Sequence, residues 1–469
     1  MSKMLEAIVS ALSLPSRECV TFAGAGELPS CYAVTELAAA SVGAAALAVR
    51  QLIAAQGGRP ARVTVDRRLA SMWFGWSLQP VGWKRPPAWD PVAGDYRTAD
   101  GWIRLHTNAP HHRDAALGVL GARAEREAVA RAVAGWRGAA LEAAVVAQGG
   151  CAAMMRSGAE WAAHEQGRAV AAEPLVALTA REGSFHAGWA PTPSRPLAGL
   201  KVLDLTRVLA GPVATRFLAG YGADVLRIDP PSWDEPGVIP EVTLGKRCAR
   251  LDLHLARDRD VFETLLTQAD VLVHGYRPAA LEGLGFSEEV RRRLNPGLVD
   301  VALDAYGWTG PLSGRRGFDS LVQMSAGIAE RGMRWRNADQ PVPLPVQALD
   351  HATGYLIAAA AVRGLVHRLE EGRATQARLS LARTALLLIG LSPSEKATTQ
   401  PLAPATEADL APELEQTAWG PARRYLPPVA IDGAPMTWDR PATKLGSSPP
   451  KWGQVWHSDT SSAAKWGQV

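Results

Sequence analysis

Between residues 201 and 303, short apolar segments alternate with stretches that carry helix signals. Five of the segments are rich in Val, Leu or Ile, as buried strands are, and they lie at 201–205, 224–228, 249–253, 269–276 and 298–303. After the first segment, Gly211 and Pro212 mark the start of a helix, because Pro fits the first helical turn. Further helices are predicted after Leu255 and near 287–293. Strands that alternate with helices are typical of a parallel, Rossmann-like sheet, so we predict an α/β fold.

The turn that follows the first predicted strand reads LTRVLAGP, and it limits the choice of ligand. A dinucleotide pyrophosphate needs a GxGxxG turn at this place, and that motif is absent. The chain also lacks a GxxxxGK(S/T) phosphate loop, an HExxH pair and a GxSxG elbow. The sequence therefore disfavours NAD, FAD, ATPase, zinc-protease and serine-hydrolase chemistry.

Length, charge and cysteine content exclude further classes of partner. A chain of 469 residues is long enough for two or three structural units. Its formal net charge is +4 and the charges are scattered, so we predict no nucleic-acid partner. The four cysteines lie far apart, which indicates a reducing compartment and no structural metal site. Because no export signal is evident, we expect a cytoplasmic protein.

Two Ala-rich stretches of the chain resemble one another. The matching pieces are 344–362 with 376–386, and 30–49 with 61–70. Each pair predicts a long helix followed by a short strand, and Glu36 falls where the later copy has Asp350, at an offset of 350 − 36 = 314 residues. This pattern predicts a partial internal duplication, although Ala-rich helices also look alike by composition. The earlier helix, about Val34 to Ala55, includes Glu36 and Arg50, so we predict a buried helix and no membrane partner.

Beyond these patterns, a long part of the chain resembles the class III CoA-transferases, or CaiB/BaiF family, which includes formyl-CoA and carnitine CoA-transferases. The matching stretches lie at 196–231, 244–253, 269–286, 294–328 and 341–362. Their order and spacing match the family as well. The resemblance implies a Rossmann-like sheet domain, a smaller α+β domain and rearranged or fused copies of the family sequence.

The resemblance and two Pro-rich stretches, 189–196 and 392–406, suggest a division of the chain. The segment DYRTADGWIRLH (95–106) resembles the start of the small domain, which here precedes the sheet domain. The predicted units are a truncated copy (1–90), the small domain (91–186), a linker (187–196), the large domain (197–390), a linker (391–419), a C-terminal segment (420–450) and a tail (451–469). Family members are similar to interlocked dimers, so we expect a pseudo-dimeric monomer or a homodimer. For the tail, in which KWGQV occurs twice, disorder is one interpretation.

Asp350, in VQALDHATG, lies at the family's catalytic position. The resemblance implies that its carboxylate attacks an acyl-CoA thioester, which is the activated-carboxylate route to group exchange. Asp before an apolar helix is also a good N-cap, and the two roles are compatible. We expect the helix N-terminus to lower the pKa of Asp350 and keep it ionised.

The motif RRGFDSLVQ carries two further candidates. The resemblance implies that Asp319 is a second catalytic residue that lines the active site and that Arg316 lies near CoA. A helix start for Asp319 and a solvated charge for Arg316 are the structural alternatives. Phe318 stands where related racemases have a His, so two-base racemisation is disfavoured.

For CoA itself, the resemblance carries over to residues at the ends of the predicted strands. These are Val208, Leu209, Leu251, His254, Gly275, Tyr276 and Leu284, which alternatively only pack the sheet. The family usually has Asn at Gly275 and Arg at Gly283, so a hydrogen bond and a phosphate-pairing cation are expected to be missing. Lys246 and Arg247 are predicted to serve the phosphates, with a solvated loop as the alternative.

Taken together, these residues predict an enzyme that moves CoA from an acyl-CoA to a free carboxylic acid. The family route passes through an aspartyl anhydride and an aspartyl-CoA thioester, with CoA as substrate and no tightly bound cofactor. The alternatives are an acyl-CoA racemase or isomerase, and a CoA-binding pseudoenzyme or partner subunit. The sequence leaves open whether Glu36 marks a second site.

Overall fold

The computed structural model describes residues 3–14, 19–59, 61–183, 189, 191–277, 279–392 and 400–453. Residues 187, 188 and 190 of the first predicted linker, 393–399 of the second and 454–469 of the predicted tail lie outside these ranges.

The largest sheet has seven strands in the order β10-β9-β8-β11-β12-β13-β7. The parallel strands are β8 (Lys201–Leu205), β9 (Asp224–Asp229), β10 (Lys246–Arg250), β11 (Val271–His274), β12 (Val299–Asp304) and β13 (Arg373–Ser380). The edge strand β7 (Ala177–Glu182) is antiparallel to β13. The six parallel strands have the order of a doubly wound Rossmann sheet, which confirms the predicted α/β fold.

Helices connect these strands, and one more helix follows the last of them. They are α9 (Ala210–Gly220), α10 (Ile239–Val242), α11 (Ala256–Thr267), α12 (Ala280–Gly283), α13 (Glu288–Leu294), α14 (Asp319–Ser325), α15 (Ile328–Arg336), α16 (Ala348–Glu371) and α17 (Leu381–Leu391). One predicted strand is displaced, because β10 covers Lys246–Arg250 instead of 249–253. A strand can begin at the buried Lys246 because its ammonium group pairs with Asp204, with Nζ 2.9 Å from Oδ2.

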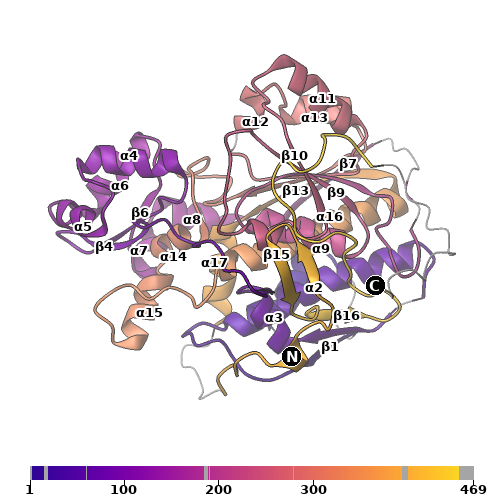
Figure 1. Cartoon of the computed structure of the whole chain (residues 1–469), viewed down its shortest axis with the longest axis horizontal. Helices are drawn as coiled ribbons and strands as arrows, with labels where there is room; N and C mark the ends of the chain where they lie inside the picture. The colour runs from indigo at the N-terminus through magenta and orange to yellow at the C-terminus, as the bar shows by residue number, and fades with distance from the viewer. Residues whose placement is uncertain are drawn as a thin grey trace.

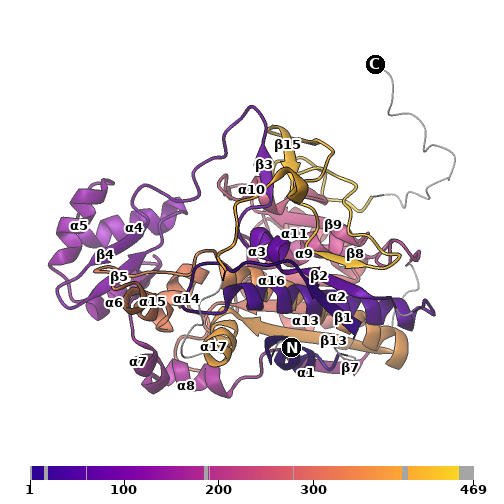
Figure 2. The same cartoon turned by 90° about the horizontal axis from the view of Figure 1, so that it is seen from below.

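The small domain extends to one side of the large sheet (Figures 1 and 2). It contains the antiparallel strands β4 (Gly94–Arg97), β5 (Trp102–Leu105) and β6 (Ala152–Met154), with α4 (Pro110–Leu120), α5 (Arg126–Ala134), α6 (Gly138–Ala147), α7 (Gly158–Ala163) and α8 (Glu165–Ala172). Tyr96, Ile103 and Leu141 belong to its own core. The predicted boundary at 186 is wrong, because residues 177–182 form β7 of the large sheet.

The N-terminal segment builds a smaller sheet beside the large one. Its elements are α1 (Lys3–Ala11), β1 (Val20–Ala23), α2 (Val34–Ala55), β2 (Val63–Asp66), α3 (Arg67–Trp73) and β3 (Leu78–Pro80). The C-terminal strands are β14 (Glu415–Thr417), β15 (Gly420–Arg424) and β16 (Val429–Ile431). Strand β2 lies between β1 and β16, and β15 lies between β14 and β3. The first and last parts of the chain are therefore joined by strand pairing.

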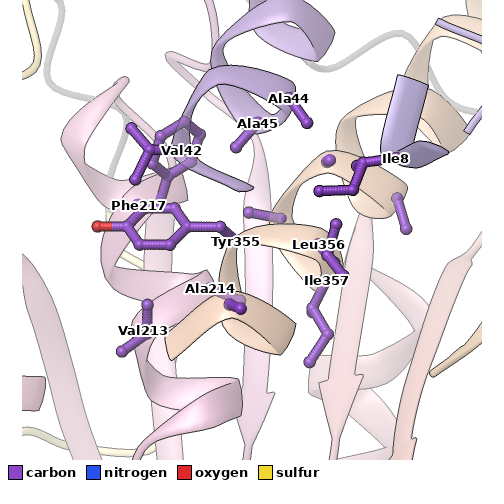
Figure 3. Close-up of a cluster of buried hydrophobic side chains, with 14 of the residues drawn as sticks. Ile8, Val42, Ala44, Ala45, Val213, Ala214, Phe217, Tyr355, Leu356 and Ile357 are labelled. Atoms are coloured by element: carbon purple, nitrogen blue, oxygen red, sulfur yellow. The ribbon is translucent and has the colours of Figure 1, made fainter. Parts of the chain in front are cut away.

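Helix α2 packs against α16 in the centre of the molecule (Figure 2). Figure 3 shows Val42 and Ala45 of α2 near Phe217 of α9 and Tyr355 of α16, and all four belong to one buried cluster. The many Ala side chains of both helices let their axes approach closely. By length and composition α2 is apolar enough to cross a membrane, but most of it is buried inside the fold, which confirms the predicted buried helix.

The two Ala-rich segments fold alike. Helices α2 and α16 begin at Val34 and Ala348, at an offset of 348 − 34 = 314 residues. Each is followed by a strand whose last residue caps the next helix: Asp66 caps α3 and Ser380 caps α17, again at 380 − 66 = 314 residues. In both places the strand has a parallel neighbour on one side and an antiparallel neighbour on the other. The similarity therefore extends from composition to topology.

The antiparallel neighbours are exchanged between the two segments. Strand β7 comes after α2 and β2 in the chain, yet it pairs with β13 of the large sheet. Strand β16 comes after α16 and β13, yet it pairs with β2 of the small sheet. Each sheet is thus completed by a strand from the other half, so neither half can separate without breaking both pairings.

Candidate active site

The first turn of α16 contains Asp350 as its third residue. Asp350 is only 7% exposed, and the N-cap of the helix is Gln347, whose side chain makes no capping bond. The Asp319 carboxylate makes the capping bonds instead: its Oδ2 accepts from the Leu349 N–H at 2.8 Å and from the Asp350 N–H at 3.0 Å. The prediction that Asp350 is the N-cap is therefore wrong, because a carboxylate from another helix occupies those amides.

Asp319 is held in place by a second buried polar residue. It is the first residue of α14, as the helix-start interpretation predicts. Its Oδ1 accepts a hydrogen bond from Gln323 Nε2, and Gln323 Oε1 accepts from the Leu344 N–H at 2.7 Å. A continuous set of hydrogen bonds thus runs from the loop before α16 to the amides of its first turn.

The electrostatics of the two carboxyl groups differ from the sequence prediction. Burial raises the pKa of Asp350 well above its usual range, and the negative charge of Asp319 raises it further. Burial also raises the pKa of Asp319 to about 6, against the bonds from Gln323 and the two amides, which favour the charged form. The predicted lowering for Asp350 is wrong, because desolvation and a like charge outweigh the helix field.

No residue that the structure describes donates a hydrogen bond to the Asp350 carboxylate. A carboxylate that is buried and unpaired is poorly solvated, which raises its free energy and makes it more nucleophilic. Such a group is costly for stability and is characteristic of a reactive site.

A cavity of about 500 Å³ lies between the small domain and the loop that precedes α14. Its wall includes Arg156, Arg277, Arg315, Arg316 and Glu142, with Gly149 and Gly150. Glu142 pairs with two of the arginines, Arg315 at 2.7 Å and Arg156 at 3.2 Å. Arg316 donates to the Gly149 carbonyl at 2.8 Å, and burial together with Arg316 lowers the pKa of Arg277. The wall therefore carries excess positive charge, which suits a phosphate or carboxylate.

The carboxyl end of β8 leads into a strained turn. Val208 has φ of 64°, an unfavourable value for a β-branched residue, and its N–H donates to Glu235 Oε2 at 2.9 Å. The neighbouring Leu209, the N-cap of α9, is nearly buried. Strained backbone at the carboxyl edge of a Rossmann sheet is typical of a ligand site. Val208 and Leu209 lie at this edge, and their contact with CoA remains a prediction.

Arg207, beside this turn, is a candidate that sequence reasoning missed. Its guanidinium carbon lies 4.6 Å from the Trp233 ring and 5.4 Å from the Tyr276 ring, and its Nη2 donates to the Tyr276 hydroxyl at 3.2 Å. The aromatic rings hold the cation at the sheet edge near Val208. The signal was present in LTRVLAGP, where an Arg is the second residue after the first strand.

Other predicted CoA residues lie in settings that do not suit phosphate binding. Lys246 is 1% exposed, and its Nζ is 2.9 Å from both Asp204 Oδ2 and the Pro212 carbonyl oxygen, so the predicted phosphate contact is wrong. Arg247 is paired with Asp224 at 2.7 Å. Leu251 is buried in the core on one face of the sheet, Leu284 is half-buried against that core, and His254 is exposed.

Gly275 and Gly283 are both free to carry a side chain. A Cβ atom added at either position would meet no atom within 4 Å, and neither backbone requires a positive φ. Packing therefore does not explain the glycines. The groups that the resemblance leads one to expect there are simply absent.

Glu36 lies where the repeat places the counterpart of Asp350. Its Oε2 is 3.4 Å from Arg67 Nη1, and its side chain is 24% exposed. Arg67 also lies 3.4 Å from Glu27. Glu36 thus belongs to a partly solvated group of charges, unlike the unpaired carboxylate of Asp350.

The fold and this site define an α/β protein with a Rossmann-type sheet, a buried pair of carboxyl groups and a basic cavity. Residues 197–418 match the model of CoA-transferase family III, and this segment belongs to that family. The buried pair, Asp319 and Asp350, lies within the matched segment.

Curated relatives are also similar to part of the chain. An acetyl-coenzyme A transferase, nodX, of Hypoxylon pulicicidum is 34% identical over 239 residues, covering 48% of this chain and 40% of the relative. A probable fatty acyl-CoA transferase, Rv3272, of Mycobacterium tuberculosis is 32% identical, covering 40% and 51%. A formyl-CoA:oxalate CoA-transferase of Escherichia coli is 30% identical, covering 42% and 50%. The chain thus spans about half or less of the length of these relatives.

A solved structure is also similar in part. The orthorhombic crystal structure of Rv3272 from M. tuberculosis matches 42% of this chain and 58% of that chain, with 30% identity and a TM-score of 0.39.

Proposed function

We propose that this protein is a class III CoA-transferase that uses Asp350 as its nucleophile. The observation that carries the proposal is the buried Asp350 carboxylate, which has no hydrogen-bond partner among the described residues. Membership of residues 197–418 in CoA-transferase family III supports it. Asp319 is the positioning residue, because it binds the backbone on which Asp350 is carried.

The reaction needs no oxidant, reductant or metal to balance. A carboxylate oxygen of Asp350 attacks the thioester carbon, the C–S bond breaks, and CoA thiolate leaves an aspartyl anhydride. The thiolate then attacks the aspartyl carbonyl, releases the donor acid and leaves an aspartyl-CoA thioester. The acceptor carboxylate attacks that thioester to form a new anhydride, and the returning thiolate takes the acceptor acyl group and frees Asp350.

The rest of the site has groups that suit the charges of CoA. The basic cavity with Arg277 and Arg316 offers pairing for phosphate oxygens, and Arg207 offers a further cation at the sheet edge. We place Val208, Leu209 and Tyr276 in the same CoA site, because all three lie at the carboxyl edge of the sheet.

Intact-protein mass spectrometry after incubation with a panel of acyl-CoAs tests this proposal. We expect an acyl or CoA adduct that peptide mapping places on Asp350, and the adduct also identifies the donor. Asp350→Ala is the control and should form none. An adduct on another residue, or none despite measurable CoA binding, would refute the mechanism.

We further propose that one chain is a pseudo-dimer with a single working site. The matched offsets, the equivalent strand arrangements and the exchange of β7 and β16 support a partial duplication. The small domain and the sheet domain that meet at the cavity come from opposite halves of the chain. Sedimentation of the active protein as a monomer, with one adduct per chain, is the expected result. Activity confined to a dimer would contradict it.

A pseudoenzyme that binds CoA without turnover is the second candidate. Gly275 and Gly283 favour it, because both positions have room for a side chain and offer no donor to CoA. CoA binding without any adduct, across the whole acyl-CoA panel, would support this alternative over the transferase.

A further inference from the structure

Two histidines of the small domain, His106 and His112, lie against the segment that leads to Asp319. His106 directly follows β5, and His111 and His112 lie in the first turn of α4. The His106 ring stacks on Phe318, with centroids 3.6 Å apart and planes 8° apart. The His112 ring approaches the same Phe318 ring at 5.9 Å and 68°. Two imidazoles thus contact the residue immediately before Asp319.

Both of these imidazoles are buried, and part of their hydrogen-bonding capacity is unused. His106 is 5% exposed and His112 is 4% exposed. Nδ1 of His106 and both ring nitrogens of His112 have no hydrogen-bond partner among the residues that the structure describes. Unpaired buried polar atoms are rare because they forfeit their bonds to water, so such a pair needs an explanation. A ligand that supplies the missing partners is one.

The charges around the two rings are positive. Arg104 acts on His106, and His111 and Arg316 act on His112. Burial, with these neighbours, lowers the pKa of His106 and of His112 to about 3, so each ring is neutral near pH 7 and carries one N–H. The surroundings therefore favour an anionic partner and offer it neutral donors.

The rings of His106 and His112 contact a segment that lies between the cavity wall and the carboxyl pair, Asp319 and Asp350. Arg316 lines the cavity, Phe318 lies two residues later, and Asp319 binds the Asp350 amide. The backbone N–H of His106 donates to the Cys151 carbonyl at 2.9 Å, and Cys151 follows Gly150 of the cavity wall. The histidines therefore contact the segment that joins the cavity to Asp319.

We propose that His106 and His112 bind the carboxylate of the acceptor acid. The inference rests on the proposed function, and it assigns the second substrate to a place in that site. Neutral donors suit this task because the acid must keep its nucleophilicity: a full ion pair with Arg would hold the oxygen charge more tightly than a hydrogen bond from neutral imidazole. The class of ligand is a carboxylic acid small enough to enter beside Phe318.

The two half-reactions separate this inference from the proposed function. Adduct formation with acyl-CoA alone requires Asp350 but not the acid site. Discharge of the isolated adduct by added acid, followed as a function of acid concentration, requires both. We expect His106→Leu to keep the rate of adduct formation within about twofold of that of the unmodified protein. The acid concentration for half-maximal discharge of the adduct should rise at least about tenfold.

Matched variants make the outcome decisive. His112→Leu should behave like His106→Leu, whereas His111→Leu, at an exposed neighbour in the same helix turn, should change neither half-reaction. Because the buried nitrogens have no described partners, replacement by Leu should not unfold the protein, and circular dichroism checks this. An unchanged acid dependence in both buried variants, or an equal loss in both half-reactions, would overturn the acid site alone. No adduct in the unmodified protein would overturn both proposals.

Discussion

The first turns of α2 and α16 occupy equivalent places in the repeat, and each contains a carboxyl side chain. The two carboxyl groups differ in their burial and in their partners. Glu36 near the start of α2 is partly exposed and paired with Arg67. Asp350 near the start of α16 is buried, has no described donor, and sits beside a second carboxyl group. The two helices have equivalent places in the topology, so the surroundings of the carboxyl group, and not the helix that carries it, make one position suitable for nucleophilic attack.

The largest expected difference concerns catalysis. Asp350→Asn removes the nucleophile and should lower the rate of adduct formation by about a thousandfold or more. Glu36→Gln should leave the rate within about twofold. Intact-protein mass spectrometry over time measures both. If Glu36→Gln abolished the adduct, Glu36 and Asp350 would both be needed for catalysis, and the proposed difference between them would be wrong.

The same pair of variants should differ in stability. A carboxyl group whose pKa is raised by folding destabilises the folded state at pH values above its unfolded pKa, and the destabilisation shrinks as pH falls from the folded pKa toward the unfolded pKa. Burial and the charge of Asp319 raise the pKa of Asp350, so Asp350→Asn should raise the free energy of unfolding at neutral pH.

Urea unfolding at pH 7.5 and pH 5 measures this effect. The advantage of Asp350→Asn should shrink toward pH 5, because the unmodified protein then takes up the proton. Glu36→Gln should stay within about 0.5 kcal/mol at both values, since it removes only a partly exposed pair. A destabilised Asp350→Asn protein would contradict the electrostatic account.

Asp319→Asn tests how much the second carboxyl group contributes to the raised pKa of Asp350, which distinguishes this position from Glu36. The negative charge of Asp319 is one cause of the raised pKa of Asp350, so its removal should lower that pKa. The pH midpoint of adduct formation should move to lower pH, so that the rate at the acidic end of the profile rises relative to the unmodified protein. The Asn oxygen can still accept from the α16 amides. A midpoint that stays in place would show that burial alone raises the pKa.

The smallest expected effect concerns the affinity of the large-sheet domain for CoA. Gly283→Arg adds a cation where no atom lies within 4 Å of the new Cβ, so CoA affinity should rise about threefold without loss of stability. Gly118→Arg, at an equally open position in α4, is the matched control and should not change affinity. Calorimetric titration with CoA measures both. Equal affinities for the two variants would place the CoA phosphates away from Gly283.

Sequence patterns predicted the Rossmann-type sheet and the buried helix at Val34–Ala55, because both depend on local periodicity. They did not predict that Lys246 is buried, since its partner Asp204 lies 42 residues away. They gave the wrong direction for the pKa of Asp350, because its burial and the nearby charge of Asp319 arise from tertiary packing. The position of a catalytic carboxylate was therefore predictable by resemblance, whereas its proton affinity depends on tertiary contacts.

The exchanged strands also determine the order in which the chain is completed during synthesis. Strand β7 has left the ribosome before β13, so the edge strand of the large sheet is ready when its neighbour arrives. Strand β16 is made long after β2, and Val429 must find Val65, which is 429 − 65 = 364 residues earlier. Until then β2 presents an unpaired edge on the nascent chain, where it is open to wrong pairing or to chaperones. The small sheet is thus finished only after the small domain and every strand of the large sheet have been translated.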